Sequence, residues 1–146
     1  MIELKVKAVA QSEGGSFTVL LTDPEEKYVL PIIIGSSEAF AIALPLQGAT
    51  YPRPFTHDLL LSICERLGAG LKEVVITDIR ENTFFAEIHL ARGEDVEVLD
   101  ARPSDAIALA IRAEVPIFME ERLVEFTMDV QDIGFENGPA KGKDLH

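Results

Sequence analysis

The sequence predicts a single α+β domain in which a mixed, largely antiparallel β-sheet packs against about three helices. Its 146 residues fit one domain of ordinary size. Apolar residues make up 47% of the chain and occur in periodic blocks separated by turn residues. Some blocks alternate with a period of two, as strands do, whereas others repeat with the helical period behind a polar capping residue.

The chain opens with a predicted β-hairpin. Residues 2–11 alternate apolar and polar, and the SEGG turn leads into the second apolar run, SFTVLLT. After DPEE, the run YVLPIIIG at 28–35 is rich in β-branched residues, as central strands are. Pro31 within it predicts a bulge or an irregular entry to the strand.

Two helices are expected next. Ser36 or Ser37 would cap the first, with Glu38 in its first turn, and Pro45 should end or kink it. The second is predicted from Thr56, its N-cap, to Leu67, before Gly68. The apolar face of this second helix comprises Leu60, Ile63, Cys64 and Leu67.

The second half of the chain predicts another hairpin and a third helix. LKEVVITDI and FFAEIHL are strands around the tight turn RENT, where Asn82 can adopt a left-handed conformation, and VEVLD follows as a strand. Ser104 is the expected N-cap of the third helix, with Asp105 in its first turn, and VPIFM is a short buried strand. We expect a domain over 1–130 and a frayed polar tail over 131–146.

Composition excludes several functional classes. The net charge is −12 and no basic block exists, which counts against non-specific nucleic-acid binding and leaves only a local arginine cluster for that purpose. The single cysteine, Cys64, cannot form an internal disulfide. No signal peptide or apolar span of about 20 residues is evident, so we expect a cytoplasmic protein that does not cross a membrane.

Two Arg-Pro pairs precede helix starts that carry an aspartate. Arg53-Pro54 precedes Asp58, and Arg102-Pro103 precedes Asp105. Because proline holds the preceding residue in an extended conformation, each arginine is aimed at a helix N-terminus, where backbone N–H groups and a guanidinium could bind phosphate. The alternative is structural: Thr56 and Ser104 would be ordinary caps, and the arginines would pair with the aspartates.

Carboxylates are the most abundant side chains that could take part in catalysis or metal binding. If several converged, they could hold Mg²⁺ or Mn²⁺ for phosphodiester hydrolysis. Near Arg80, a local hairpin salt bridge is the competing interpretation. Three histidines and one cysteine make a closed zinc site improbable, and a Cys64–His57 dyad is weakly supported. The carboxylates at turns and helix starts are Glu38, Asp58, Asp78, Glu81, Asp100 and Asp105.

Four blocks carry a resemblance to a known family. LPIIIGSSEAFAIAL, YPRPFTHDLL, ITDIRENTFFAEIHL and LDARPSDAIALAIRAEVPIFM together resemble the bifunctional nuclease domain family, in the order and spacing of that family. The resemblance implies a mixed α/β domain that forms homo-oligomers, and nuclease activity on RNA and DNA in some members. Pro45 departs from the family pattern, which continues a helix at that position.

The resemblance gives two hypotheses. In the first, the chain is a nuclease in which a subset of Asp58, Asp100 and Asp105 holds Mg²⁺ or Mn²⁺, with no organic cofactor. The arginines bind phosphates, and His57 acts as acid or base near the unperturbed histidine pKa of about 6.5. In the second, it is a non-catalytic oligomeric module that binds a small anion or a protein. A solvent-open cleft at the motif residues favours the first, and fully paired, buried salt bridges favour the second. The candidate residues are His57, Asp58, Asp100 and Asp105 for catalysis, Arg53, Arg80, Arg102 and Ser104 for substrate binding, and Glu38, Glu81 and Asn82 as further motif positions.

Overall fold

The computed structural model describes residues 1–133, and most of the predicted tail at 131–146 lies outside the described residues. The described residues form three α-helices and eight strands, and the α+β class with about three helices is as the sequence predicts. The helices are α1 (Ser36–Leu46), α2 (Thr56–Arg66) and α3 (Pro103–Ala113). The strands are β1 (Ile2–Gln11), β2 (Phe17–Thr22), β3 (Tyr28–Ile34), β4 (Ala69–Arg80), β5 (Thr83–Arg92), β6 (Asp95–Ala101), β7 (Ile117–Met119) and β8 (Met128–Asp129). Three short 3₁₀ helices are η1 (Glu13–Gly15), η2 (Glu121–Phe126) and η3 (Val130–Ile133).

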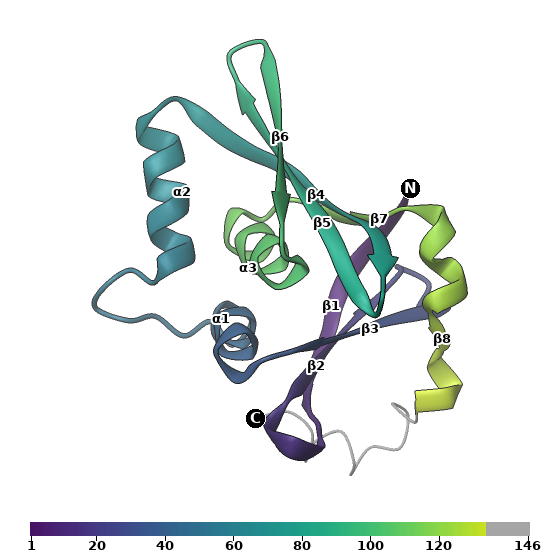
Figure 1. Ribbon diagram of the computed structural model, residues 1–146. Helices are drawn as coiled ribbons and strands as arrows, with labels where there is room; N and C mark the ends of the chain where they lie inside the picture. The colour runs from purple at the N-terminus through teal and green to yellow at the C-terminus, as the bar shows by residue number, and fades with distance from the viewer. Residues whose placement is uncertain (134–146) are drawn as a thin grey trace.

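The eight strands form one mixed sheet in the order β6-β5-β4-β7-β1-β2-β3-β8. Every neighbouring pair is antiparallel except β4 and β7, which are parallel. The three residues of β7 pair with β1 on one side and with β4 on the other, so this short strand alone joins the two halves of the sheet. Figure 1 shows the three helices together on one side of the sheet and η2 on the other.

The core lies between the sheet and helices α1 and α3. Ile42 of α1 and Ile107 of α3 are fully buried against strand residues such as Leu30 and Ile76. Three alanines of α3, at 106, 108 and 110, are also fully buried. Small side chains let two helices approach each other closely, so α3 occupies the centre of the helical layer.

Helix α2 differs from the other two because none of its residues is buried. The helix is amphipathic, as the sequence predicts, but much of its apolar face is open to solvent. Figure 1 shows α2 apart from the main body of the sheet, with the start of β4 leading from it. Three apolar side chains of α2 and that of its C-cap residue, Leu67, are 44–70% exposed. The three within the helix are Leu59, Leu60 and Ile63.

The predicted helix caps need correction. Helix α2 begins at Thr56, and its N-cap is Phe55, whose backbone N–H donates to Asp58 Oδ2 at 2.9 Å. The N-cap of α3 is Arg102 rather than Ser104, because Pro103 takes the first helical position that suits its fixed φ. Helix α1 is preceded by Gly35, so neither Ser36 nor Ser37 is its cap. In α2 the first-turn carboxylate of Asp58 therefore accepts the N–H of the N-cap residue.

The two prolines that were expected to disturb regular structure are accommodated. Pro31 faces Leu20 in an unbroken β2–β3 register, so the predicted bulge is absent. Beyond Val29, β3 has no second neighbour among the described strands, and an edge strand tolerates a residue without an N–H. Pro45 lies inside α1, which ends one residue later at Leu46, so the helix ends close to where the sequence predicts.

The turn between β4 and β5 confirms the prediction for Asn82, which has a φ of 64°. Glu81 beside it also has a positive φ, of 50°. Two consecutive left-handed residues define the type I′ turn, whose twist matches that of the flanking strands.

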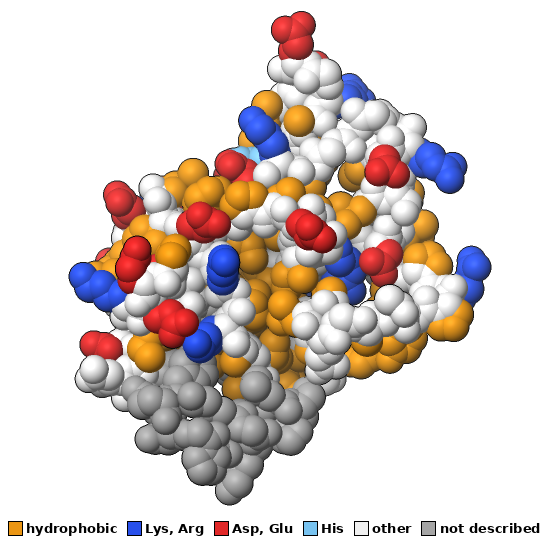
Figure 2. Space-filling view, turned by 180° about the vertical axis from the view of Figure 1, so that it is seen from behind, with side chains coloured by type: hydrophobic (Ala, Val, Ile, Leu, Met, Phe, Trp, Pro, Cys, Tyr) orange, Lys and Arg blue, Asp and Glu red, His pale blue; other side chains and the backbone are white. Residues whose placement is uncertain are grey.

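Charges are spread over the surface. On the face seen in Figure 2, acidic and basic side chains alternate and no broad basic surface forms. Among residues 1–133, no helix is long and apolar enough to cross a membrane.

Candidate functional site

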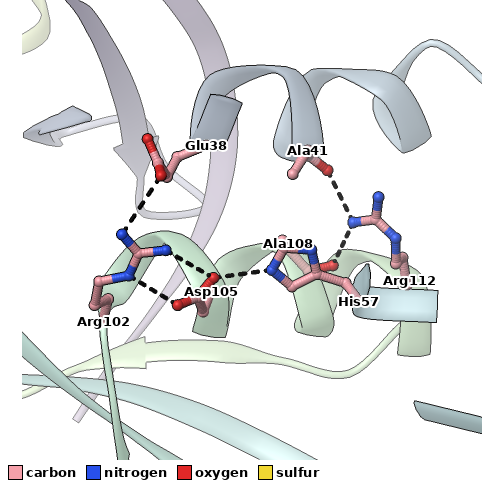
Figure 3. Close-up of polar contacts among 7 residues, drawn as sticks. All are labelled: Glu38, Ala41, His57, Arg102, Asp105, Ala108 and Arg112. Carbon is pink, nitrogen blue, oxygen red and sulfur yellow. Dashed lines mark hydrogen bonds and ion pairs between the residues drawn. The ribbon is translucent and has the colours of Figure 1, made fainter. Parts of the chain in front are cut away.

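The first turns of all three helices meet in one hydrogen-bonded network (Figure 3). His57, in the first turn of α2, contacts Asp105 Oδ1 through Nε2 at 2.9 Å. Arg102 donates from Nε to Asp105 Oδ2 at 2.9 Å and from Nη2 to Asp105 Oδ1 at 3.3 Å. Its remaining nitrogen, Nη1, donates to Glu38 Oε2 in α1 at 3.4 Å. Residues 48 and 64 positions apart thereby form one polar group.

The charges in this network stabilise one another. Partial burial of Asp105 opposes its ionisation, but hydrogen bonds from Arg102 and His57 outweigh that effect and hold the pKa of Asp105 below its ordinary value. The hydrogen bond to Asp105 raises the pKa of Arg102, so the guanidinium stays charged. His57 is mostly shielded, with 13% of its side chain exposed, whereas Arg102 is 63% exposed. Arg102 can therefore reach a ligand in solvent.

This network lines a large hollow, with a volume of about 950 Å³. Its walls come from α1, α2, α3, the middle of β5 and the end of β6. Asp100 faces the same hollow and is exposed, without a hydrogen bond to any of residues 1–133. Apolar side chains, Phe40 and Phe55 among them, complete the lining. Five of the residues singled out from the sequence meet here: Glu38, His57, Asp100, Arg102 and Asp105.

A second hollow, of about 380 Å³, adjoins the first. Asp58 lies in this neighbour and accepts a hydrogen bond from Arg112 Nε at 3.1 Å. Arg53 lines it too and is exposed, with no hydrogen bond or ion pair to residues 1–133. Asp58 therefore belongs to a different group of contacts from His57, although the two are adjacent in sequence.

Comparison with known proteins places this site in a family. The profile of the bifunctional nuclease domain matches residues 19–130, which include every residue of both hollows. The chain belongs to the bifunctional nuclease domain family. An uncharacterized protein of Mycobacterium tuberculosis is 47% identical over 106 residues, which cover 73% of this chain and 63% of that protein.

Plant relatives of this bifunctional nuclease domain are more distant. Bifunctional nuclease 1 of Oryza sativa subsp. japonica is 31% identical over 108 residues, covering 72% of this chain and 33% of that protein. Bifunctional nuclease 2 of Arabidopsis thaliana is 27% identical over 111 residues, covering 74% and 34%. The chain thus spans about a third of the length of these plant relatives and under two thirds of the mycobacterial one.

The remaining family motif positions lie outside the main hollow. Arg80 is paired with Asp78 at 3.1 Å, which is the local hairpin salt bridge that the sequence suggested, and it lies 4.3 Å from the ring centre of Phe85. Asp78 also accepts the Ile79 N–H, which helps to lower its pKa. Glu81 and Asn82 form the type I′ turn. The salt bridge and the turn formed by these residues stabilise the β4–β5 hairpin.

Ser104 of the bifunctional nuclease domain is buried, with 6% exposure. It lines a smaller hollow of about 270 Å³ together with Thr83, Phe84, Arg102 and Glu38. The R-E-N-T-F and D-A-R-P-S-D blocks are therefore adjacent in space, on the side of Arg102 away from His57.

The use of Mg²⁺ or Mn²⁺ stays a prediction. Among residues 1–133, no three His, Cys, Asp or Glu side chains converge closely enough to hold an ion. Asp58 is turned toward Arg112, and both oxygens of Asp105 are hydrogen-bonded to Arg102 and His57. Cys64, half-buried in α2, forms no hydrogen bond with His57. The donor set fits proton transfer and anion binding better than ion coordination.

Arg112 is the residue that sequence reasoning missed. Its side chain is only 7% exposed, and Nη1 donates to Ala41 O at 2.8 Å and to Ala108 O at 3.0 Å. With its bond to Asp58, it ties α1, α2 and α3 together. A signal was present, because Arg112 lies seven residues after Asp105, two helical turns along the same face of α3.

Proposed function

We propose that this bifunctional nuclease domain hydrolyses phosphodiester bonds in RNA and DNA. Family membership supports the reaction class, and the plant relatives bear the name bifunctional nuclease. The observation that supports the site is the contact of His57 with Asp105, beside an exposed Arg102, in the large hollow. A carboxylate that holds a histidine ring, next to a guanidinium, is suited to moving a proton while charge builds on phosphate.

In this proposal Asp105 orients the imidazole ring of His57 through the contact with Nε2. Nε2 of His57 is engaged by Asp105, which leaves Nδ1, without a partner among residues 1–133, for the proton transfer. Arg102 binds the phosphate and offsets the negative charge of the transition state. Glu38 in turn fixes the direction of Arg102 through Nη1. Arg53 supports binding of a neighbouring phosphate from the adjacent hollow.

The chemical step is a nucleophilic displacement at phosphorus. His57 takes a proton from water, an oxygen lone pair forms the new P–O bond, and the bond to the leaving oxygen breaks. The leaving oxygen takes up a proton from solvent and His57 releases its proton to solvent, so atoms and charge balance. Asp100, exposed in the same hollow, is the carboxylate that remains available for a second proton transfer or for Mg²⁺ or Mn²⁺. The expectation of a metal stays a prediction, and the step above does not depend on it.

A cleavage assay with matched histidine variants tests the proposal. His57→Ala should reduce cleavage of single-stranded RNA and DNA at least 100-fold, since general acid–base catalysis typically contributes 10²–10⁴-fold. His89→Ala is the control, because His89 also lies between carboxylates, 2.9 Å from Glu73 and 3.2 Å from Glu87, but on the sheet. Its activity should match that of the wild type. The assay is run with Mn²⁺, with Mg²⁺ and with EDTA.

The outcomes separate the proposed nuclease from its alternative. Equal cleavage by the wild type and His57→Ala in all three conditions would refute the role of His57. No cleavage by any folded protein would favour a non-catalytic module that binds a small anion or a protein. That alternative has some support, because Asp105 is already paired with Arg102 through both oxygens. Arg102 is nevertheless mostly exposed in an open hollow, which favours the nuclease.

We also propose that the domain forms a homo-oligomer through the free edge of β6. β6 is the terminal strand of the sheet, lacks proline and pairs with β5 without a register shift. Val96 and Val98 are each 54% exposed and Leu99 is 47% exposed. An unprotected apolar edge strand is a template for pairing with another chain.

Two copies of β6 can pair antiparallel about a two-fold axis at Val98. Glu97 would then face Leu99 of the partner subunit, and Asp95 would face Ala101 of the partner subunit, so that no two carboxylates are directly opposed. Sedimentation velocity should show a dimer for the wild type and a monomer for Val98→Arg. A monomeric wild type at high protein concentration would refute the proposal, and Lys72→Arg, a charge-preserving change on β4, serves as the control.

A further inference from the structure

Three aromatic rings form a cluster beside the large hollow, and two of them are exposed. Phe40 lies on α1, and Tyr51 and Phe55 lie in the segment between α1 and α2. The ring centres are 4.9 Å apart for Tyr51 and Phe55, 5.9 Å for Phe40 and Phe55, and 6.3 Å for Phe40 and Tyr51. Phe40 is 49% exposed and Tyr51 is 50% exposed. We call these three residues the aromatic ridge.

The aromatic ridge separates the two hollows. Phe55 lines both of them, Phe40 lines only the large one, and Tyr51 lines only the neighbouring one. An arginine stands in the hollow on each side: Arg102 in the large hollow and Arg53 in the neighbouring one. The order along this surface is therefore guanidinium, aromatic rings, guanidinium.

The two arginines are suited to anions in different ways. Arg53 is exposed and lacks an ion pair among residues 1–133, although the chain has 25 acidic residues against 13 lysines and arginines. Prolines on both sides restrict the backbone of Arg53, so its segment loses less conformational entropy when it binds a ligand. Arg102 is 63% exposed and already directed by Glu38 and Asp105. Each can bind a phosphate without losing a buried partner.

We propose that the aromatic ridge is a stacking platform for an unpaired nucleic-acid base, with phosphates of the same strand at Arg102 and Arg53. The inference rests on the proposed nuclease function and adds that the substrate is bound as a single strand. Aromatic rings beside a cationic track bind bases through their π-faces, and in a duplex those faces are covered by neighbouring base pairs. The two flanking arginines favour a polyanion over a second copy of this acidic chain.

Oligonucleotide binding tests the stacking role separately from cleavage. A labelled ten-nucleotide oligothymidine is titrated with protein carrying His57→Ala, so that the strand stays intact, and fluorescence anisotropy gives Kd. Adding Phe40→Leu and Tyr51→Leu should weaken binding about 5- to 150-fold, the measured range for loss of one stacked base. The control is Phe126→Leu in η2, which removes a ring that is 44% exposed far along the chain and should change Kd less than about 2-fold.

Further ligands identify what the ridge recognises. A decamer of abasic deoxyribose phosphates should bind the parent and the ridge variant equally, because it keeps the phosphates but has no base to stack. The oligouridine decamer should lose as much affinity as the oligothymidine, since both sugars leave the base faces available. A blunt duplex of the same length should bind more weakly than either single strand.

The contradicting results are distinct from failure of the nuclease proposal. Equal Kd values for the ridge variant and its parent with oligothymidine would overturn the inference, as would a loss confined to one sugar. A changed sedimentation coefficient with unchanged oligonucleotide binding would assign the ridge to a protein interface instead, which also overturns it. If the wild type bound strands through the ridge yet cleaved none, the nuclease proposal alone would fail.

Discussion

Arg112 and Pro45 should be energetically coupled, although they lie on different helices. Proline has no N–H, so within α1 it leaves the carbonyl of Ala41, four residues earlier, without its helical donor. Arg112 Nη1 donates to that carbonyl at 2.8 Å. A feature that normally disrupts a helix is thus compensated from α3. Removing the arginine should expose the defect that the proline creates.

The expected magnitude follows from these contacts. In Arg112→Met, loss of the charge-assisted bond to the buried Ala41 carbonyl costs roughly 1.5–3 kcal/mol. Loss of the contact with Asp58, which is 45% exposed, adds at most about 1 kcal/mol. Ala108 O keeps its own helical donor and adds little. The free energy of unfolding should therefore fall by about 2–4 kcal/mol.

A double-mutant cycle isolates the coupling. Pro45→Ala restores an N–H to the Ala41 carbonyl, so in that background Arg112→Met should cost only about 1 kcal/mol, giving a coupling of about 1–3 kcal/mol. Urea unfolding followed by circular dichroism measures all four proteins, with Arg66→Met, an exposed arginine of α2, as the control expected to change stability by less than about 0.5 kcal/mol. A coupling below about 0.5 kcal/mol would refute the compensation.

Three further predictions concern stability. The lowered pKa of Asp105 means that its ionised form stabilises the fold above about pH 4, and that this contribution is lost as pH falls through the lowered pKa. The free energies of unfolding of the wild type and Asp105→Asn should therefore differ more at pH 6 than at pH 3. The same difference at both pH values would contradict this prediction. Glu114→Gly should raise stability by up to about 1 kcal/mol, because Glu114 ends α3 with a φ of 58°, a conformation that glycine adopts without cost; chemical denaturation measures it. Replacing Glu81-Asn82 by Asn-Gly, the preferred type I′ pair, should increase the free energy of unfolding by about 1 kcal/mol, which raises the melting temperature by several degrees. A lower melting temperature would count against the assigned turn.

The sequence predicts the secondary structure well because most of the information is local. Alternation, turn residues and capped helix starts locate three helices and the principal strands, and Asn82 takes the left-handed conformation expected of it. The errors concern contacts across the fold. The serine and threonine caps were wrong because first-turn carboxylates and Pro103 define those helix starts. Pro45 is tolerated through Arg112, which no local pattern could reveal.

The site was predictable in composition but not in grouping. Sequence blocks identify His57, Asp105 and Arg102 as chemically interesting, yet they give Asp58 the same standing as its neighbour His57. Adjacent residues at a helix start point about 100° apart, so one reaches Asp105 and the other reaches Arg112. Only the packing of α2 against α3 decides which carboxylate meets which arginine.

The short strand β7 also governs when this domain can close during synthesis. Residues 117–119 join β1 to β4, and β1 is made first. At ribosomal rates of about 5–20 residues per second, the amino-terminal hairpin waits on the order of ten seconds for its neighbour in the sheet. Helix α3 leaves the ribosome only shortly before β7, so His57 has no Asp105 to hold it during most of that interval. A nascent chain that carries the first half of the site therefore lacks the His57–Asp105 contact until the sheet is almost complete.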